Sequence, residues 1–331
     1  MDLRQLTSVI TVAEVGSVTK AARLLHLVQP AVTRQIQLLE EELGVALFER
    51  TPRGMILTGH GEVIVDRARR ALRELDRARR EVQPGPGEVT GAVTVGMLES
   101  TVDIMVSRLV TAVRDHHPGI QLRIVTAYSG HLQHWLDAGD VDVSLLYNLT
   151  DTPSLAVLPL LEERLWVVGP RDAGLNHRRP MSWAKALENP MIFPVPGHGL
   201  RALIERARSG VSVEPQVVAE ANSMYVQKRL VSAGHGWTVL PAAGVAGDVA
   251  DGRFSAAPLV EPTVSRALVI GHQRIARTPR PVQAVAAEIV RLARELVRQE
   301  EWPSARLTAT EPQQLHGKNA TRPVAPHRRI P

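Results

Sequence analysis

The sequence predicts a multidomain protein of the α+β class, with an N-terminal winged helix-turn-helix, a long linker helix and a C-terminal α/β domain. Three observations support this fold class. Two short amphipathic segments precede a third helix at residues 29–44, a long charged helix follows near residue 58, and strand and helix patterns alternate after residue 91. A chain of 331 residues is also too long for one ordinary core, which indicates two or three domains.

The segment from Gln29 to Gly44 organises the first region. Pro30 suits the first turn of a helix, and Gly44 suits a left-handed stop. An apolar side chain recurs at helical spacing, at Val32, Ile36, Leu39 and Leu43. The opposite side carries Gln29, Thr33, Arg34 and Gln37. Such groups at the leading end of a helix could contact base edges and phosphates in a major groove, although an ordinary surface helix shows the same pattern.

Two shorter helices are predicted before this segment. Leu6, Ile10 and Ala13 mark the first, which ends at Gly16, and Ser17 can cap the second. The second helix carries Val18, Ala21, Ala22 and Leu25. A connection of a few residues then leads to Gln29. Two tightly joined helices of this kind are typical of a helix-turn-helix.

A small hairpin is predicted next, with strands at residues 47–50 and 55–57 and Pro52 and Gly54 in its turn. A hairpin after a helix-turn-helix is a wing. Arg50 and Arg53 would lie on or beside its tip, where an arginine can reach phosphates or a narrow minor groove.

Residues 1 to about 60 resemble the N-terminal domain of the LysR-type transcriptional regulators. The matching residues are Leu3–Leu6, Val12–Glu14, Gly16-Ser17, Ala21-Ala22, Leu24–His26, Gln29–Ala31, Thr33–Ile36, Leu39–Gly44, Leu47–Arg50, Leu57-Thr58 and Gly61. In that family the helix that begins at Gln29-Pro30 recognises DNA, and a wing arginine helps to hold it. The resemblance therefore implies DNA contacts by Gln29, Pro30, Thr33, Arg34, Arg50 and Arg53.

Two residues depart from the family pattern. Val28 stands where the family usually has a serine, and Val18 where a phenylalanine is usual. Valine cannot cap a helix, and the loss of a cap typically costs about 1 kcal/mol. We expect a weaker helix start but an intact three-helix fold.

Thr58 is predicted to cap a long helix that runs to about Val82, or roughly 36 Å for some 24 residues. Its apolar residues Val65, Ala68, Leu72 and Leu75 follow a 3–4–3 spacing. This stripe suits either a solvated helix packed on its own domain or a seam between two chains. The resemblance favours the seam, since the family pairs subunits through this helix, and two recognition helices would then face two half-sites. Residues 84–90, with Pro84-Gly85-Pro86-Gly87, are the expected hinge.

From residue 91 to about residue 300 the pattern indicates a parallel sheet covered by helices. The first expected strands are Ala92–Gly96, Gln121–Ala127 and Val141–Leu146, separated by helices at Thr101–His116 and His131–Ala138. Further strands are expected at Leu165–Val168, Met191–Phe193, Val217–Ala219, Trp237–Leu240 and Ala267–Gly271, and a last helix at about residues 281–298. Gly197-His198-Gly199 is typical of a turn rather than of a phosphate-binding loop.

This half also resembles the family, through residues 230–241 with Gly234 and Gly236. The resemblance implies an effector domain of two α/β lobes, similar to periplasmic solute-binding proteins. Lobe one would comprise residues 91–164 and 267–300, and lobe two residues 165–266. A small ligand would bind in the cleft between them.

The ends of the predicted strands supply candidate effector contacts. Ser100 and Thr101 fall where a strand meets a helix N-terminus, a place that favours an anion. The other candidates are Ser129, Asn148, Phe193, Asn222 and Ser223. Ser100 or Ser223 could instead simply cap a helix. The helix N-terminus at the cleft favours a carboxylate-bearing metabolite as the effector.

Catalytic and metal-binding functions find little support. Cysteine is absent, which excludes disulfides, thiol nucleophiles and cysteine-based zinc sites. No GxSxG elbow, P-loop, GxGxxG or HExxH motif is present. His131 and His134 with Asp137 suit a polar helix surface better than a metal site. We therefore predict no enzyme activity, no catalytic residue, no metal and no cofactor.

The net charge of +5 is a poor guide to nucleic-acid binding. Residues 302–331 contain five basic residues and one acidic residue, so they hold four of the five net charges. DNA binding must therefore depend on where the arginines lie. The segment 301–331 lacks periodicity and is expected to be a disordered tail, whose arginines could add a weak DNA contact.

The sequence thus predicts a ligand-responsive DNA-binding regulator of the LysR type. It would be soluble and cytoplasmic at the nucleoid, because no long apolar stretch or signal peptide is visible. Expected partners are double-stranded DNA, a small-molecule effector and further copies of the chain in a homodimer or homotetramer, with RNA polymerase as a further candidate. The alternatives are a small-molecule-binding protein whose N-terminal domain serves protein contacts, and an α/β enzyme that uses the cleft.

Overall fold

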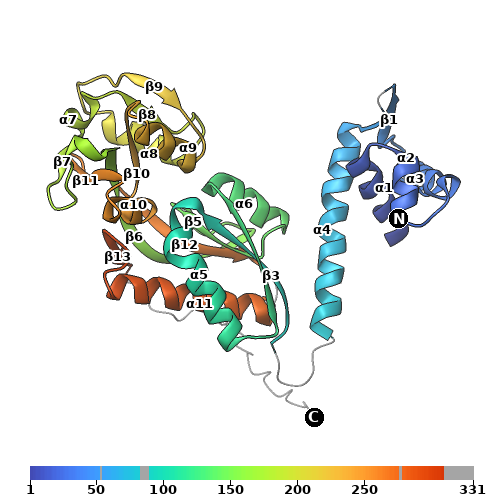
Figure 1. The fold of residues 1–331 in the computed structure, drawn as a ribbon. Coiled ribbons are helices and arrows are strands. Elements are labelled where there is room, and N and C mark those ends of the chain that lie inside the picture. Colours follow the sequence, from blue (N-terminus) through green and yellow to red (C-terminus); the bar gives the residue numbers. More distant parts are fainter. Residues whose placement is uncertain (53, 83–88, 276–277, 309–331) are drawn as a thin grey trace, which may run out of the picture. The chain divides into compact units, whose positions relative to one another are not determined.

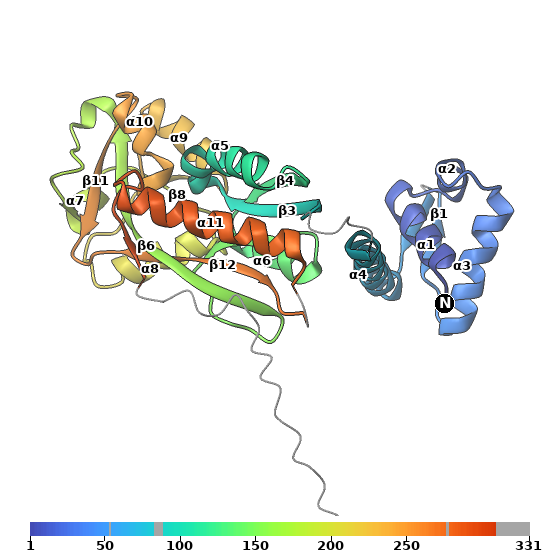
Figure 2. The same cartoon turned by 90° about the horizontal axis from the view of Figure 1, so that it is seen from below.

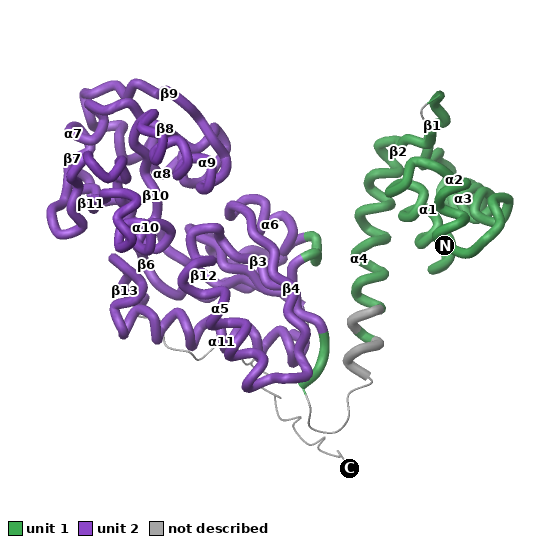
Figure 3. Tube along the Cα trace, in the orientation of Figure 1, with its two compact units in different colours: residues 1–91, 138–140 green, residues 92–137, 141–331 purple. Residues whose placement is uncertain are grey.

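The computed structural model describes residues 1–52, 54–82, 89–275 and 278–308. The chain forms two compact units, one of residues 1–91 with 138–140 and one of residues 92–137 with 141–331 (Figure 3). Most of the predicted hinge, residues 84–88, lies outside the described residues.

Three helices open the first unit, α1 (Leu3–Val15), α2 (Val18–Leu24) and α3 (Gln29–Leu43) (Figure 1). Asp2 and Gln5 form a capping box at α1, and Ser17 accepts a hydrogen bond from the Lys20 amide at α2. Helix α3 has no side-chain cap, because its N-cap residue is Val28. Residues Gly16 and Gly44 end α1 and α3 in the left-handed conformation.

The apolar stripes of these helices meet in one core. That core consists of Leu6, Val9, Val12, Ala21, Ala22, Val32, Ile36, Leu39, Leu47, Phe48, Val65 and Ala68. It joins all three helices to the wing and to the long helix α4 (Gly59–Val82). The three-helix arrangement therefore forms without a side-chain cap on α3.

The wing is an antiparallel pair of β1 (Phe48–Thr51) and β2 (Gly54–Leu57). It is tied to α3 by Glu40, whose Oε1 accepts hydrogen bonds from the amides of Leu47 at 2.7 Å and Phe48 at 3.3 Å. The Met55 amide donates to the carbonyl of Gly16 at 2.9 Å. These bonds join the wing to both ends of the helix-turn-helix.

Gly61 lets the first turn of α4 approach the wing. A Cβ atom at this position would lie 2.1 Å from the carbonyl oxygen of Leu47, a backbone atom that cannot rotate away. Helix propensity alone would make Gly61→Ala stabilising by about 1 kcal/mol. We expect the opposite, a loss of about 1–3 kcal/mol from overpacking, measured by thermal unfolding. Gly59→Ala is the matched control, since nothing lies within 4 Å of its Cβ position, and an equal response of both variants would contradict this account.

The predicted seam of α4 needs revision. Val65 and Ala68 are buried in the core of their own unit, packed with residues of α1 and α3. A surface that pairs two chains needs exposed apolar side chains, which these two do not supply. Leu72 is half-buried and Leu75 is 46% exposed, so the more distal half of the stripe is still available.

A mixed sheet forms the second unit, with strand order β4-β3-β5-β12-β6-β10-β8-β9. Its first strands are β3 (Gly91–Leu98), β4 (Ile120–Ala127) and β5 (Val143–Tyr147), followed by the long β6 (Leu155–Pro170) and by β12 (Ser265–Gln273). The prediction of a parallel sheet is wrong for β6 and β12. β12 is antiparallel to β5, and β6 is antiparallel to β12 and β10.

Strand β6 runs through both lobes of this unit. Its residues 155–164 pair with β12, and its residues 165–168 pair with β10 (Trp237–Pro241). We refer to the elements on the first side as lobe one and to those on the second side as lobe two. The charged run at residues 162–164 falls in the middle of this strand, so the sequence prediction placed a strand only at residues 165–168.

Helices cover both faces of lobe one. α5 (Glu99–His116) and α11 (Arg280–Arg298) lie side by side on one face, and α6 (Ser129–Ala138) lies on the other (Figures 1 and 2). Lobe two contains β7 (Met181–Ser182), α7 (Trp183–Leu187), β8 (Met191–Phe193), α8 (Gly199–Arg208), β9 (Val217–Glu220), α9 (Met224–Ser232), α10 (Ala246–Ala250), β11 (Phe254–Val260) and two 3-10 turns, η1 (Arg171–Ala173) and η2 (Ala242–Gly244). The sequence prediction missed β7 and β11.

The chain does not become irregular after α11. Trp302 is only 2% exposed, and β13 (Ala305–Leu307) pairs with β6. The expectation of a disordered tail from residue 301 is therefore wrong for residues 302–308, because β13 pairs with β6 and the side chains of Trp302 and Ser304 form hydrogen bonds with Glu163 and Trp166 of that strand. Residues 309–331 lie outside the described part of the chain.

Candidate functional site

The leading half of α3 forms a polar surface on the first unit. Gln29, Pro30 and Arg34 are exposed, whereas Thr33 is half-buried and its hydroxyl donates to the Gln29 carbonyl at 3.1 Å. The acids of this helix, Glu40–Glu42, lie in its last turns. The helix N-terminus adds partial positive charge to that of Arg34. This end of α3 can therefore meet a polyanion.

The wing adds one exposed cation to the described surface. Arg50 on β1 is exposed. Arg53, the other predicted wing contact, lies outside the described residues. Val28 at the start of α3 is 69% exposed and places an apolar side chain beside Gln29.

A pocket of about 50 Å³ lies between the two lobes of the second unit. The start of α5, the end of β5 and the start of α8 meet there. Its apolar walls include Leu98, Leu200, Met224, Leu240 and Pro241, and its polar side chains are Glu99, Ser100, Tyr128, Tyr147, His198, Asn222, Gln227 and Arg266. The space suits roughly four water molecules or a small polar group of a ligand.

Arg266 brings a positive charge into this pocket. Its side chain is 4% exposed, and its Nε donates to Oε1 of the fully buried Glu163 at 2.7 Å. Its Nη2 also donates to the hydroxyl of Ser100 at 2.5 Å. A buried charge is tolerated when it is paired and hydrogen-bonded in this way. Among the described residues these bonds use Nε and Nη2, which leaves Nη1 for a ligand.

Tyr147 places a hydroxyl beside that guanidinium. The residue is 8% exposed, and the carbon between the guanidinium nitrogens of Arg266 lies 5.1 Å from its ring centroid. Burial raises the pKa of the phenol, and the charge of Arg266 and the nearby Leu200 amide oppose that rise. The Leu200 amide is close but already donates to His198, and within the described chain the hydroxyl has no partner in hydrogen-bond geometry. An unpartnered buried hydroxyl is costly unless a ligand uses it.

His198 caps α8 and closes one side of the pocket. Its Nδ1 accepts a hydrogen bond from the Leu200 amide at 3.1 Å, and its ring lies 4.7 Å from that of Tyr128, centroid to centroid. Burial lowers the pKa of His198 to about 4, and the charge of Arg266 contributes. The imidazole is therefore neutral at pH 7.

This pKa predicts a pH-dependent stability. In the unfolded chain a histidine titrates near pH 6.5, so acid favours unfolding between pH 6.5 and pH 4. We expect the free energy of unfolding to fall more between pH 7 and pH 5 in the native chain than in His198→Asn, which keeps a capping acceptor but does not titrate. Urea denaturation at both pH values measures this, and His235→Asn, an exposed histidine, serves as the control. Equal losses in the native chain and in His198→Asn would contradict it.

Glu99 joins the two lobes at the pocket. It lies in the first turn of α5, and its Oε2 accepts a hydrogen bond at 2.8 Å from the Met224 amide at the start of α9. A carboxylate is favourable at a helix N-terminus. The Glu99 carboxylate therefore already places one negative charge at the start of α5, where the sequence predicted a bound anion.

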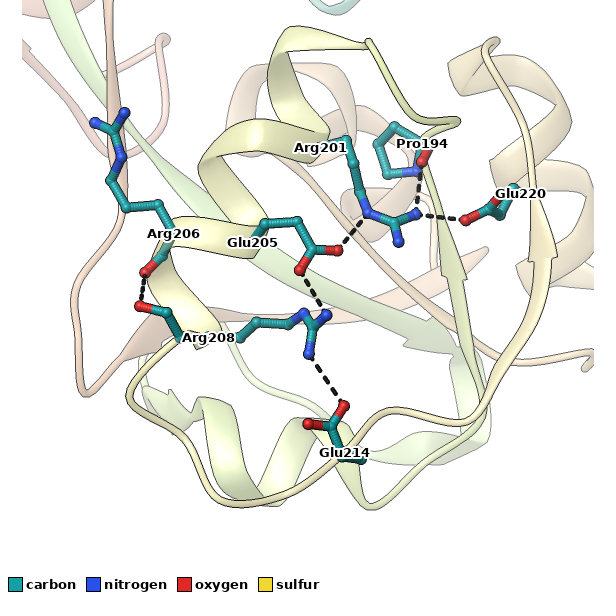
Figure 4. A network of polar contacts seen from close by, with 8 residues as sticks. Pro194, Arg201, Glu205, Arg206, Arg208, Glu214 and Glu220 are labelled. Atoms are coloured by element: carbon teal, nitrogen blue, oxygen red, sulfur yellow. Dashed lines mark hydrogen bonds and ion pairs between the residues drawn. The ribbon is translucent and has the colours of Figure 1, made fainter.

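A network of arginines and glutamates connects α8 to its surroundings in lobe two (Figure 4). Arg201 donates to the Pro194 carbonyl at 3.0 Å, and to Glu205 and Glu220 at 2.6 Å each. Burial alone would raise the pKa of Glu205, but hydrogen bonds from Arg201 and Arg208 outweigh it and lower the pKa. The start of α8, with His198, is therefore fixed on β8 and β9.

Two family descriptions match the chain. "Bacterial regulatory helix-turn-helix protein, lysR family" matches residues 3–62, and "LysR substrate binding domain" matches residues 86–294. The chain belongs to the family of LysR-type transcriptional regulators. It is a DNA-binding regulator of transcription with an effector-binding domain, and not an enzyme.

Curated relatives agree with this assignment. The chain is 31% identical over 292 residues to the HTH-type transcriptional regulator BbuR of Bordetella bronchiseptica, a match that covers 88% of this chain and 90% of that protein. It is 28% identical over 242 residues to the nitrogen assimilation regulatory protein nac of Klebsiella aerogenes, covering 73% of this chain and 78% of that protein.

Solved structures show the same full-length LysR fold. Full-length OxyR from Pseudomonas aeruginosa has 22% sequence identity and a TM-score of 0.67, and covers 94% of this chain and 99% of its own. Full-length CbnR in complex with its target DNA has 23% identity and a TM-score of 0.65, and covers 89% and 99%.

The structure brings only two of the predicted effector contacts of this LysR-type chain to the pocket, Ser100 and Asn222. The hydroxyl of Thr101 donates to the Leu98 carbonyl, and that of Ser129 accepts from the Tyr147 amide. Exposed Asn148 bonds the backbone of Ala267. Phe193 is buried in the core of lobe two, and Ser223 begins α9 without lining the pocket. Thr101, Ser129, Asn148 and Phe193 thus have contacts within the fold, and none of the five positions lines this pocket, so their role as effector contacts stays a prediction from the sequence.

The sequence analysis missed Glu99, Tyr147, His198 and Arg266. Tyr147 directly follows a predicted strand, and Arg266 directly precedes one, so strand ends did carry a signal. The glycines on both sides of His198 predict a turn and give no sign of a pocket residue. No sequence signal joins Arg266 to Glu163, which lies 103 residues away.

Metal and membrane features can be stated for the described residues only. Within them, no group of three or more histidine, aspartate or glutamate side chains could hold a metal ion. His131 packs edge-on against the ring of Tyr128, and Asp137 accepts a hydrogen bond from Ser154. No helix in the described ranges combines the length and apolar character needed to cross a lipid bilayer.

Proposed function

We propose that this LysR-type regulator binds specific DNA sites through the leading half of α3 and changes its action when a small carboxylate occupies the pocket between its lobes. The observation that carries the ligand response is the pairing of a buried arginine, Arg266, with the unpartnered hydroxyl of Tyr147 in that pocket.

The DNA-binding part of the proposal rests on α3 and the wing. Gln29, Pro30 and Arg34 are exposed at one end of the helix, with Thr33 beside them and Arg50 on the wing. Amide and guanidinium groups of this kind read adenine and guanine edges in the major groove. Arg53 remains a predicted contact from the sequence alone.

A carboxylate is the ligand class that the pocket favours. Its oxygens would accept hydrogen bonds from Nη1 of Arg266 and the hydroxyl of Tyr147, and Asn222 offers a further donor. Glu163 already neutralises Arg266, so the ligand adds one negative charge to a paired site. The small volume of the pocket and its apolar walls would favour a small monocarboxylate over a strongly charged one.

The regulator would act as a homodimer or a homotetramer. Paired α4 helices, with Leu72 and Leu75 in the seam, would present two α3 helices to two half-sites one or more DNA turns apart. A ligand can change this arrangement only if it binds one arrangement more tightly than the other. Because its target is DNA, we place its action in the cytoplasm at the nucleoid, with RNA polymerase as a further partner.

Selection of genomic fragments with the purified full chain tests the DNA-binding part. Fragments that share a two-fold related motif would support it. Equal recovery of all duplexes at matched salt would overturn it. Thermal unfolding with a panel of sodium carboxylates tests the ligand class, and stabilisation only by cationic compounds would overturn that part alone.

Tyr147→Phe separates ligand recognition from folding. The variant loses only an unpartnered hydroxyl, so the midpoint of thermal unfolding without ligand should stay the same or rise. Its affinity for the stabilising carboxylate should fall about tenfold or more, because a hydrogen bond to a charged group is lost. Tyr225→Phe is the matched control, since Tyr225 is exposed and lies outside the pocket lining. Equal affinities of the two variants would remove Tyr147 from the site.

A further inference from the structure

Residues 300–308, here called the C-terminal segment, pack against the effector domain beyond the family match, which ends at residue 294. Ala305 of β13 lies opposite Glu163 of β6, and the Trp166 indole donates to the hydroxyl of Ser304 at 3.0 Å. Glu301 forms an ion pair with Arg108 of α5. The segment is thus held on β6 and α5 at several points.

One of these contacts leads directly to the pocket. The Trp302 indole N–H donates to Oε2 of Glu163 at 2.6 Å, and Oε1 of the same carboxylate accepts from Nε of Arg266 at 2.7 Å. Arg266 in turn donates to Ser100, and both line the pocket. Trp302, Glu163 and Arg266 are all nearly or fully buried. A continuous polar chain therefore runs from the C-terminal segment to the proposed ligand site.

We propose that the C-terminal segment regulates the effector pocket: Trp302, acting through Glu163, positions Arg266 for the ligand, and the bound ligand in turn holds the segment on β6. This inference rests on the proposed function, since it concerns the same ligand site. Trp302 and Glu163 are positioning residues, because neither lines the pocket.

The sign of the coupling follows from the charges. A ligand carboxylate on Arg266 would share the positive charge of the guanidinium with Glu163. The negative charge of Glu163 is then less fully neutralised by Arg266, and the hydrogen bond from the Trp302 indole stabilises it more. Without that donor, Oε2 of Glu163 is buried without a partner and an added negative charge is less well tolerated. Ligand binding and segment docking therefore strengthen each other, and the coupling is reciprocal.

Nuclear magnetic resonance of the full chain with labelled tryptophan tests this coupling. The chain has five tryptophans, and the Trp302 indole signal is assigned by its loss in Trp302→Phe. The probe is sodium acetate, compared with sodium chloride at equal ionic strength. We expect acetate to move the Trp302 indole proton downfield, as for a stronger hydrogen bond. The Trp183 indole, which donates to the Pro262 carbonyl at 3.0 Å, should not move.

Two matched variants separate the polar chain from simple anchoring of the segment. Trp302→Phe keeps an aromatic ring but loses the N–H, and should weaken acetate binding by at least about fivefold, the low end of usual coupling. Trp166→Phe removes the other indole bond to the segment but leaves Glu163 untouched, and should change acetate binding by less than about twofold. Equal acetate affinity in the native chain and Trp302→Phe overturns the inference and leaves the proposed function standing.

A ligand-free arm keeps the two proposals distinguishable. If no carboxylate binds the native chain, the proposed ligand class is wrong. The inference about the C-terminal segment is then tested without ligand, by the effect of Ser100→Ala on the Trp302 indole signal. This variant removes a partner of Arg266 on the pocket side. A shift of the Trp302 indole signal in Ser100→Ala supports transmission through Arg266 and Glu163, and an unchanged signal overturns it.

Discussion

Glu163→Ala is expected to lower the free energy of unfolding by about 3–5 kcal/mol, the usual cost of removing one partner of a buried ion pair. Glu163 is fully buried and Arg266 is 4% exposed, so the guanidinium would stay in the interior without its counter-charge. The Trp302 indole would also lose its acceptor. Denaturant unfolding followed by tryptophan fluorescence measures the loss.

Two controls define what this loss means. Glu301→Ala removes an equally charged residue from an exposed ion pair with Arg108, and should cost less than about 1 kcal/mol. The double variant Glu163→Leu with Arg266→Met removes both charges, and should regain most of the stability lost in Glu163→Ala. A loss below about 1 kcal/mol in Glu163→Ala would show that the pair is not buried as described.

Arg34→Ala is expected to weaken binding to the selected DNA site by about 1–3 kcal/mol, or roughly fivefold to 150-fold. Arg34 is exposed on the leading half of α3, where no acidic side chain of that helix lies. Arg298→Ala is the matched control, because it removes the same charge from an exposed position at the end of α11. Gel-shift titration at fixed salt measures both.

The salt dependence separates two roles for Arg34. A phosphate contact would weaken all duplexes alike and lower the salt slope by about one unit, whereas a base contact would relax the preference at one position. Unchanged binding in Arg34→Ala would remove this residue from the DNA surface. Thr33→Ala should have the smaller effect, since the Thr33 hydroxyl is already bonded to the helix backbone.

The helix-turn-helix could be predicted because its signals are local. Ser17, Pro30 and Gly44 mark helix ends, and each lies within a few residues of the apolar stripe of its helix. In the structure all three lie at helix ends. Periodicity does not say what a stripe packs against. For that reason the 3–4–3 spacing of α4 included Val65 and Ala68 in a seam between chains, although they belong to the core of one chain.

The pocket could be located only in part, because its key contacts are distant in sequence. Ser100 and Asn222 follow from the rule that ligands meet strand ends. The pairing of Glu163 with Arg266 does not, since the charged run 162–164 has the composition of a loop. Trp302 was missed for a related reason. Its neighbours are proline and polar residues without periodicity, and the Glu163 carboxylate that accepts the hydrogen bond of the buried indole lies 139 residues away.

The bond between Glu40 and the start of the wing has a consequence for operator geometry. Because the Glu40 carboxylate accepts hydrogen bonds from the Leu47 and Phe48 amides, we expect α3 and the wing of the proposed DNA surface to move as one unit. In a dimer of the proposed kind, the wing and α3 of one chain would then not reorient separately to fit an unusual spacing of the half-sites. The DNA between the half-sites would have to bend instead, and smooth bending by 40–90° costs of the order of 1–6 kcal/mol. Flexible pyrimidine–purine steps between half-sites should therefore favour binding although no side chain touches them.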